Sequence, residues 1–238
     1  MILGDVCTRN CTYCNVKKRI PLEVDLNEPE RVARIVKKLN LNYVVITSVT
    51  RDDLLDGGAS IFAQTIQAVK DLSSGTKIEV LIPDFKGNPD SLKKVIDAKP
   101  YVLAHNLETV ERLFPIVRSQ GNYKRSLNLL KVAKEINPAP ARRSGVNPNI
   151  FTKSGIMVGM EETREEVIEA MEDLREVGCD IFTIGQYLQP SLNHLPITKY
   201  YSPEEFKEFK EIGEEMGFLY IESGPLVRSS YHAAEAIL

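Results

Sequence analysis

Short apolar runs alternate along the chain with longer segments in which apolar residues recur every three or four positions. The short runs are rich in β-branched residues, which indicates strands, and the longer periodic segments indicate helices. The expected strands are 43–47, 77–81, 101–104, 155–158, 181–184 and 218–221. The expected helices are 27–39, 59–72, 91–98, 123–136, 163–177 and 203–216. This alternation predicts a mostly parallel sheet with helices between its strands.

Residues at the expected helix starts support these boundaries. Asn27 is a suitable N-cap for the first helix. Thr163 precedes Glu166 by three residues, which is the spacing of a capping box. Two adjacent glycines, Gly57 and Gly58, come before the second helix. They either allow the backbone to approach a cofactor closely or simply open the helix.

Right-handed crossovers between parallel strands produce either a doubly wound sheet or a barrel. The sequence contains neither G-x-G-x-x-G nor G-x-x-x-x-G-K-[ST], which disfavours a nucleotide-binding doubly wound fold. We therefore expect an α/β fold, a full or partial (β/α) barrel of about six parallel strands, with residues 1–238 forming a single domain. Residues 1–4 are typical of the end of a strand. Residues 137–153, with three prolines and two adjacent arginines, are typical of a long loop.

Composition narrows the possible partners. The 238 residues carry a net charge of −3, and Lys and Arg are spread along the chain without forming a basic stripe. This distribution disfavours nucleic-acid binding. The sequence shows no apolar run as long as a membrane span and no apolar leader after a charged start. We therefore expect a cytoplasmic protein that binds neither nucleic acid nor membrane.

Three of the four cysteines lie within eight residues near the N-terminus: Cys7, Cys11 and Cys14. This C-x3-C-x2-C segment follows residues 1–4, the expected end of a preceding strand, and so lies at the end of a barrel where active sites are built. Three thiolates on one short loop can bind three irons of a [4Fe–4S] cluster and leave the fourth iron open. The alternatives are a structural zinc site or cysteines without metal, but a closed zinc site requires four ligands.

The fourth cysteine, Cys179, directly precedes the expected strand 181–184. It would lie at the N-terminal end of a strand, whereas the cysteine loop follows the C-terminal end of one. A strand of five or six residues is roughly 17–20 Å long. We therefore interpret Cys179 as a small core residue and not as a ligand.

The cysteine spacing is that of the radical SAM superfamily, and stretches along the whole chain resemble one of its families, the lipoyl synthases. The resemblance is carried by Met1-Ile-Leu-Gly-Asp-Val-Cys-Thr-Arg-Asn-Cys, Thr47-Ser-Val-Thr-Arg-Asp-Asp-Leu, His105-Asn-Leu-Glu-Thr-Val, Lys153-Ser-Gly-Ile-Met-Val-Gly, Gln186-Tyr-Leu-Gln-Pro with His194-Leu-Pro, and Gly224-Pro-Leu-Val-Arg-Ser-Ser-Tyr-His-Ala. Together these stretches are far more specific than the three cysteines alone.

The resemblance implies a sulfurtransferase whose open iron binds S-adenosylmethionine. One electron then breaks a C–S bond of this cofactor and frees a 5′-deoxyadenosyl radical. The radical removes hydrogens from carbons 6 and 8 of an octanoyl group on a carrier protein, and sulfur is inserted at both carbons. The implied partners are an octanoylated lipoyl carrier protein (the glycine cleavage H protein or a dehydrogenase E2 lipoyl domain) and an electron donor such as ferredoxin or flavodoxin.

Positions after the expected strands supply candidate residues for binding this cofactor. At the end of the expected strand 43–47 lie the candidates for holding its methionine part: Thr47, Ser48, Arg51 and Asp53. Asn106 and Glu108 follow the expected strand 101–104, and the Glu108 carboxylate is expected to bind the ribose hydroxyls. The alternative for Asn106 is a helix N-cap. Arg118 and Lys153 are expected to meet the cofactor carboxylate or the substrate, with a surface salt bridge as the alternative.

Lipoyl synthases carry an auxiliary [4Fe–4S] cluster as the sulfur source, bound by three cysteines that precede the radical SAM motif. The sequence begins six residues before Cys7, so this site is expected to be incomplete in the chain as given. The Arg228-Ser-Ser-Tyr motif is intact within a C-terminal extension, 224–238. The resemblance makes Ser230, in preference to Ser229, the fourth ligand of that cluster. A helix cap before 231–237 is the alternative.

Three functions remain open at this point. The first is lipoyl-synthase-like sulfur insertion, with the missing cysteines on a longer N-terminus or on a partner. The second is another radical SAM reaction, or a partner-dependent subunit without its own auxiliary cluster. The third is a non-catalytic iron–sulfur barrel subunit, which the polar residues at the barrel mouth disfavour. The sequence leaves the carrier protein, the electron donor and the oligomeric state undetermined.

Overall fold

The computed structural model describes residues 1–137 and 150–235. Contacts divide the chain into two compact units. Unit 1 comprises Met1–Arg9, Val16–Ala104 and Val132–Phe151. Unit 2 comprises Asn10–Asn15, His105–Lys131 and Thr152–Leu238. No helix among the described residues is long and apolar enough to cross a membrane.

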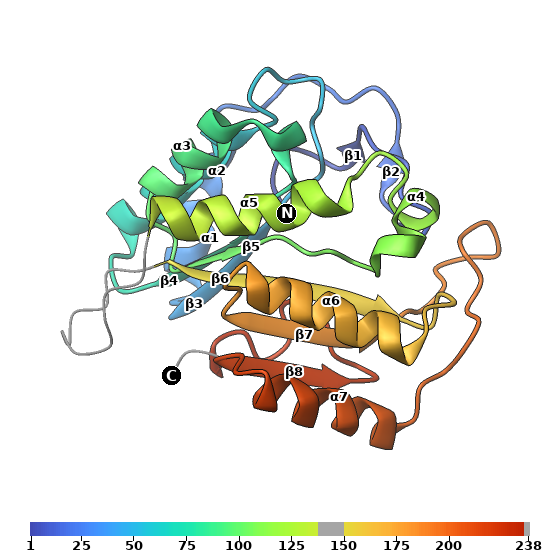
Figure 1. Ribbon diagram of the computed structural model, residues 1–238. Coiled ribbons are helices and arrows are strands. Elements are labelled where there is room, and N and C mark those ends of the chain that lie inside the picture. Colours follow the sequence, from blue (N-terminus) through green and yellow to red (C-terminus); the bar gives the residue numbers. More distant parts are fainter. Residues whose placement is uncertain (138–149, 236–238) are drawn as a thin grey trace. The chain divides into compact units, whose positions relative to one another are not determined.

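Unit 1 contains three parallel strands that pair in chain order. They are β3 (Tyr43–Thr47), β4 (Lys77–Leu81) and β5 (Val102–Ala104). Helix α1 (Glu28–Lys38) precedes β3, and α2 (Ala59–Leu72) and α3 (Pro89–Asp97) connect the strands, with α2 packed against both of the other helices (Figure 1). The shorter elements are β1 (Val6–Cys7), β2 (Lys17–Lys18) and the 3-10 turn η1 (Phe85–Gly87). Helices between parallel strands are the arrangement that the sequence pattern predicts.

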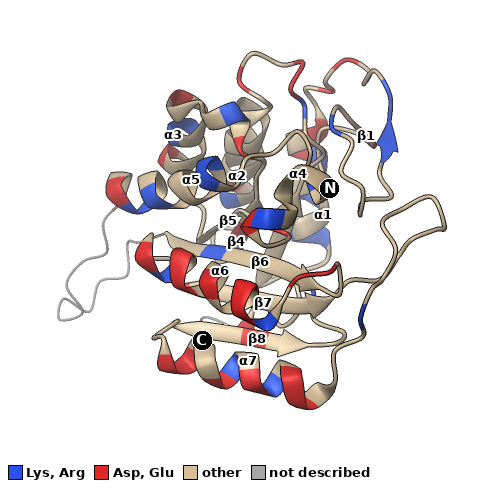
Figure 2. Ribbon diagram, turned by 45° about the vertical axis from the view of Figure 1, so that its right-hand side comes forward, with Lys and Arg blue, Asp and Glu red and all other residues tan. Residues whose placement is uncertain are grey.

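Unit 2 repeats this architecture with three more parallel strands. They are β6 (Phe151–Val158, whose first residue belongs to unit 1), β7 (Ile181–Gln186) and β8 (Tyr220–Gly224). Its helices include α6 (Arg164–Glu176) and α7 (Pro203–Glu215), and α7 packs against β8. The 3-10 turn η2 (Glu111–Leu113), α4 (Phe114–Val117) and the start of α5 (Tyr123–Ile136) precede β6. Figure 2 shows that Asp and Glu are prominent on α6 and α7.

Apolar faces of the helices form the core of each unit. In unit 1 the α2 side chains Phe62 and Ile66 are fully buried, because apolar residues three to four apart lie on one helix face. In unit 2 Phe206 and Phe209 of α7 are each 1% exposed. Both rings lie about 6 Å from the ring of Tyr201 between centroids, as tilted pairs.

The predicted helix starts are confirmed in most details. Thr163 and Glu166 form a reciprocal capping box at the start of α6. Ser202 and Glu205 form a second one at α7, which the sequence analysis did not identify. Asn27 occupies the N-cap position of α1, but its side chain makes no capping hydrogen bond.

Two predictions of local structure are wrong. Residues 1–4 do not form a strand, because Ile2 makes only an isolated bridge with Ser48. Residues 151–153 do not belong to a loop, because β6 already begins at Phe151. The remainder of that predicted loop, 138–149, lies outside the described residues. Lys153 is buried in β6, so tertiary packing overrides the polar character of this short stretch.

Gly58 opens α2 in the left-handed conformation, with φ of +91°. A Cβ at this position would lie 2.4 Å from Cδ1 of buried Leu3. We expect Gly58→Ala to lower the free energy of unfolding by about 2–4 kcal/mol, because backbone strain and overpacking add. Urea denaturation measures this change.

Gly75→Ala is the matched control for that measurement. A Cβ on Gly75 has no heavy atom within 4 Å, so the same exchange there should change stability by less than about 0.5 kcal/mol. Equal effects at the two glycines would contradict the packing explanation. The position of Gly58 at the N-cap of α2, against Leu3, favours the interpretation that Gly57 and Gly58 open the helix.

Candidate functional site

The first part of the cysteine loop is attached to the end of β3 in unit 1. The Thr8 amide and hydroxyl both donate to the carbonyl of Thr50, each at 3.0 Å. The Thr8 hydroxyl in turn accepts a 3.0 Å hydrogen bond from the Asp52 amide. These bonds fix the backbone next to Cys7, whose side chain is half-buried.

Arg9 anchors the same segment through two carboxylates. Its guanidinium donates to Asp52 at 2.7 and 3.0 Å and to Asp84 at 2.5 Å. The side chains of Arg9 and Asp84 are 3% and 0% exposed. Burial lowers the pKa of Arg9, but the hydrogen bonds to Asp52 and Asp84 outweigh it and the pKa is raised. Arg9 therefore carries its positive charge in the folded protein.

The residues predicted to hold the methionine part of the cofactor lie together after β3. Thr47 ends β3, and its carbonyl accepts from the Ile2 amide at 2.8 Å. The hydroxyl of Ser48 is buried without a hydrogen-bond partner. The Arg51 guanidinium contacts the Asp53 carboxylate at 2.9 Å and lowers the pKa of that carboxyl group.

Arg51 also donates to the carbonyls of Leu3 and Leu22, at 3.3 and 2.9 Å. Its side chain is 4% exposed. These contacts give Arg51 a structural function in holding the N-terminal segment of unit 1. Its predicted part in cofactor binding remains a prediction.

Cys11 and Cys14 lie on one tight turn in unit 2. The Cys14 amide donates to the Cys11 carbonyl at 3.2 Å, which closes the turn and brings the two Cα atoms near each other. Thr12, between them, donates from its amide to Val117 at 3.1 Å and from its hydroxyl to Ile116 at 3.2 Å. The end of α4 therefore supports this turn.

The segment that follows β7 supports the turn from a second direction. His194 Nε2 lies 3.2 Å from the Cys14 carbonyl, and its Nδ1 lies 2.8 Å from the Ser191 hydroxyl. The Leu195 amide donates to the Thr12 carbonyl at 3.1 Å. A histidine held by a hydrogen bond at each ring nitrogen has a fixed orientation.

Glu108 is the centre of a half-buried polar cluster in unit 2. Its carboxylate accepts hydrogen bonds from Tyr13 and from Asn106, the latter at 3.2 Å. Arg118 donates to the carbonyls of Asn106 and Leu107 at 2.6 and 3.3 Å. Burial raises the pKa of Glu108, while Arg118 and the two hydrogen bonds act in the opposite direction.

The backbone of Glu108 is strained. Its φ is +71°, in the left-handed region that residues with a Cβ rarely adopt. Two hydrogen bonds to β6 maintain it: the Glu108 amide donates to the Gly155 carbonyl, and the Met157 amide donates to the Glu108 carbonyl, each at 2.9 Å. Strain of this kind concentrates at functional sites, and here it fixes where the carboxylate points.

The structure removes three of the alternatives kept open by the sequence. Asn106 is not a helix N-cap, because the next helical turn is capped by Val110. Arg118 and Lys153 do not form surface salt bridges, since they are only 8% and 1% exposed. Ser230 is exposed in a series of turns that runs to residue 234. Most of the helix proposed for 231–237 is therefore replaced by turns over the described residues.

Cys179 is completely buried at the N-terminal side of β7. Its Sγ lies 3.4 Å from the carbonyl of Ile181. The Cys11–Cys14 turn contacts the segment that follows the other end of β7. A strand of six residues is about 20 Å long, so Cys179 is remote from that turn.

The described residues include no group of three or more His, Cys, Asp and Glu side chains placed to hold a single metal ion. This gives no support to the structural zinc alternative, which needs four ligands around one ion. A cubane cluster requires less closely spaced thiolates, because each cysteine binds a different iron. None of the four cysteines forms a disulfide.

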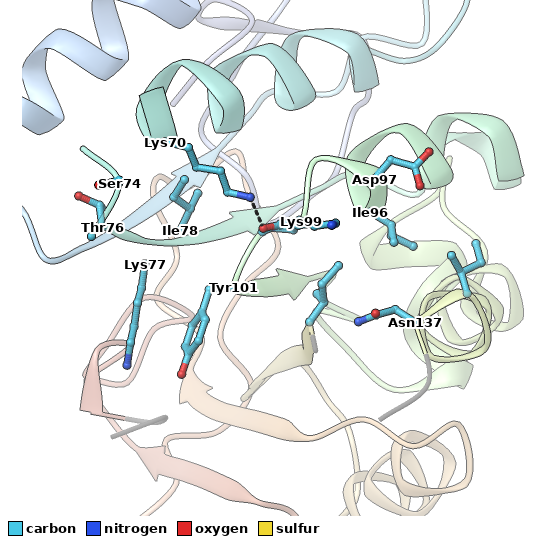
Figure 3. A pocket seen from close by; sticks show the side chains of 14 residues that line it. Lys70, Ser74, Thr76, Lys77, Ile78, Ile96, Asp97, Lys99, Tyr101 and Asn137 are labelled. Carbon is cyan, nitrogen blue, oxygen red and sulfur yellow. Dashed lines mark hydrogen bonds between the residues drawn. The ribbon is translucent and has the colours of Figure 1, made fainter. Parts of the chain in front are cut away.

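A cavity of about 530 Å³ lies in unit 1 (Figure 3). Its lining includes Lys77, the first residue of β4, and Tyr101, which directly precedes β5. It also includes Lys70, which donates to the Lys99 carbonyl at 2.8 Å. Thr47 pairs with Leu81 at the opposite end of β4. The residues predicted to bind the cofactor are not among those that line this cavity.

Sequence reasoning missed several residues that position the cysteine loop, notably Arg9, Tyr13, Asp52, Asp84 and His194. Four of them belong to, or lie next to, stretches that already resembled the lipoyl synthases, so that resemblance was the available signal. Asp84 follows β4 and gave no signal in the sequence.

Comparison with known proteins assigns the family. The sequence profile of the radical SAM superfamily matches residues 1–174. Lipoyl synthase of Caldicellulosiruptor saccharolyticus is 56% identical over 235 residues, which cover 99% of this chain and 79% of that protein. Lipoyl synthase of Aquifex aeolicus is also 56% identical, over 100% of this chain and 83% of its own length.

Solved structures agree with this assignment at the level of the fold. Methylornithine synthase superposes with a TM-score of 0.65 at 14% identity, covering 94% of this chain and 70% of that one. The FeFe-hydrogenase maturase of Carboxydothermus hydrogenoformans gives a TM-score of 0.66 at 16% identity, covering 99% and 64%. The predicted radical SAM-type (β/α) fold is confirmed, and the chain belongs to the lipoyl synthase family of the radical SAM superfamily.

Proposed function

We propose that this chain forms the S-adenosylmethionine-cleaving part of an enzyme that makes lipoyl groups by inserting sulfur at carbons 6 and 8 of a protein-bound octanoyl group. The observation that carries the proposal is the cysteine loop, whose three thiols follow the C-x3-C-x2-C spacing and whose backbone is tied to the segments that follow β3 and β7. The chain around this loop is 56% identical to lipoyl synthases over nearly its whole length. Family membership implies a [4Fe–4S] cluster and S-adenosylmethionine as cofactors.

The residues present fit these two groups. Thiolates are the preferred ligands of a cubane cluster, and all three thiols are half-buried. Buried polar atoms without a partner need an explanation such as a ligand. Three of the predicted cofactor-binding side chains have a buried polar atom without a hydrogen-bond partner. These atoms are Ser48 Oγ in unit 1, and Asn106 Oδ1 and Arg118 Nε in unit 2.

The roles follow from this chemistry. Cys7, Cys11 and Cys14 would hold the cluster, which when bound supplies the electron that cleaves S-adenosylmethionine. Around the methionine part, the proposed binding residues are Thr47, Ser48, Arg51 and Asp53. Glu108, held by Tyr13 and Asn106, would accept the ribose hydroxyls. The buried cations Arg118 and Lys153 would face the carboxylate of the cofactor or the substrate.

Sulfur would come from an auxiliary [4Fe–4S] cluster that is consumed as a substrate. Ser230 would be its oxygen ligand, and the three partner thiolates would lie outside the four cysteines of this sequence. An exposed hydroxyl is a weaker ligand for iron than a thiolate, which suits a cluster that must be dismantled. The acceptor would be an octanoylated carrier domain in the cytoplasm, with ferredoxin or flavodoxin supplying electrons.

Glu108→Gln tests the assignment of the ribose contact. A carboxylate hydrogen bond to a hydroxyl contributes about 1.5–3 kcal/mol, so Kd for S-adenosylmethionine should rise roughly 10- to 100-fold. Equilibrium binding to the cluster-loaded protein measures this change. Glu111→Gln removes an exposed carboxylate of the same unit and should leave Kd unchanged. Equal losses in both variants would contradict the assignment.

The proposed function as a whole is tested by anaerobic reconstitution with iron and sulfide. The loaded protein is given S-adenosylmethionine, a reductant and an octanoylated carrier, and 5′-deoxyadenosine and lipoyl groups are quantified by mass spectrometry. The proposal expects cofactor cleavage that depends on the octanoyl group. Cleavage that is unaffected by the octanoyl group would instead indicate a different radical SAM reaction.

A further inference from the structure

Arg9 lies within the cysteine loop and contacts Cys7 in a way that family membership does not explain. Its backbone amide donates a hydrogen bond to Cys7 Sγ, with an N···S distance of 3.4 Å. Hydrogen bonds to cysteine sulfur stabilise negative charge on the sulfur and are one of the means by which a protein sets the reduction potential of an iron–sulfur cluster. The direction of this N–H bond depends on where residue 9 is held.

The guanidinium of Arg9 fixes the position of the whole residue through ion pairs. It binds Asp52 through two nitrogens and Asp84 through one of them, and the side chains of Asp52 and Asp84 are 17% and 0% exposed. A planar guanidinium that engages a carboxylate with two donors fixes orientation as well as distance. Arg9 therefore cannot rotate without leaving buried charge uncompensated.

The two carboxylates are themselves fixed. The Asp84 carboxylate accepts from the Lys86 amide at 3.1 Å, at the start of η1. The Asp52 amide donates a hydrogen bond to the hydroxyl of Thr8, the residue that precedes Arg9. Thr8, Arg9 and Asp52 thus form a closed set of hydrogen bonds within unit 1.

We infer that Arg9 is a positioning residue whose ion pairs with Asp52 and Asp84 direct its backbone amide at Cys7 Sγ, and so help to set the reduction potential and the retention of the cluster. The inference rests on the proposed function, because it takes Cys7 as a cluster ligand. Arg51 is buried to a similar degree but does not hold the cysteine loop in this way. Its guanidinium donates hydrogen bonds to the Leu3 and Leu22 carbonyls and to Asp53.

The test compares Arg9→Lys and Asp84→Asn with the unchanged protein after anaerobic reconstitution. Lysine keeps the charge but loses the two-donor geometry, and asparagine keeps the shape of Asp84 but loses its charge. Redox titration followed by electron paramagnetic resonance gives the midpoint potential, and a chelator gives the rate of iron release. Circular dichroism reports whether each variant is folded.

We expect both variants to shift the midpoint potential to more negative values, because the reduced cluster loses a hydrogen bond to sulfur. Iron release should be about tenfold faster, as is typical when an outer partner of a metal ligand is removed. Arg175→Lys is the control, because the Arg175 guanidinium is likewise held by hydrogen bonds. It donates to the backbone carbonyls of Met216 and Cys179, in unit 2 and on the side of Cys179. It should change neither quantity.

The two hypotheses fail in different ways. If the unchanged protein binds no iron, the proposed function fails and this inference falls with it. If the unchanged protein binds iron but folded Arg9→Lys and Asp84→Asn keep its potential and its rate of iron release, only the inference is overturned. If Arg9→Lys does not fold, the milder Asp84→Asn decides the result alone.

Discussion

Replacing any one of Cys7, Cys11 or Cys14 by alanine should reduce bound iron from about four atoms per chain to background and abolish cleavage of S-adenosylmethionine. With three thiolates, the loss of one leaves too few ligands to retain a cubane that already has an open iron. Iron and sulfide analysis, together with quantification of 5′-deoxyadenosine, measures both effects. The expected loss in cleavage is complete, because the remaining thiol, Cys179, is completely buried and remote from the Cys11–Cys14 turn.

Cys179→Ala is the matched control, since it removes a thiol that is completely buried beside β7. It should retain full iron and full cleavage activity, while stability decreases by about 1 kcal/mol through the small cavity left behind. A Cys179→Ala protein that folds but binds no iron would show that both the ligand assignment and the separation of the two sites are wrong.

Sulfur insertion should separate from cofactor cleavage in a polypeptide of these 238 residues. We expect the polypeptide to produce 5′-deoxyadenosine but no lipoyl product, because its cysteines do not suffice for two clusters. Supplying a segment with three auxiliary cysteines, in cis or as a partner, should restore lipoyl formation. Ser230→Ala should then block lipoyl formation and leave cofactor cleavage intact.

Two further variants make this experiment decisive. Ser74→Ala removes an exposed hydroxyl in unit 1 and should have no effect on either product. Ser229→Ala should reduce lipoyl formation much less than Ser230→Ala, and the reverse order would move the ligand to Ser229. Lipoyl product from the 238-residue polypeptide, without any added sulfur source, would overturn the auxiliary-cluster argument.

Local periodicity was sufficient to predict the longer helices and strands, but not the short elements β1, β2 and α4. The bounds of α2, α5, β3 and β4 agree with the predicted ranges, because each has an uninterrupted apolar pattern. The start of β6 was missed because Lys153 is charged and follows a stretch rich in proline. Its burial depends on the surrounding strands and not on its neighbours in sequence.

The site was predictable only where its chemistry is local. Cys7, Cys11 and Cys14 fall within one short motif, so their spacing identifies them. The residues that fix the loop are distant in sequence: Arg9 lies 43 residues from Asp52 and 75 from Asp84. No spacing rule connects such partners, and they became visible only when the parallel strands brought their C-terminal ends together.

The burial of Cys179 gives the protein two chemically distinct classes of thiol. In iron-free protein the three loop thiols are half-buried and should react with a maleimide within minutes, whereas Cys179 should react only when unit 2 unfolds. Loss of iron and loss of fold can therefore be timed separately in a single labelling experiment, by counting adducts per chain in a mass spectrum. An aged preparation with three adducts is still folded and can be reconstituted, and one with four is not.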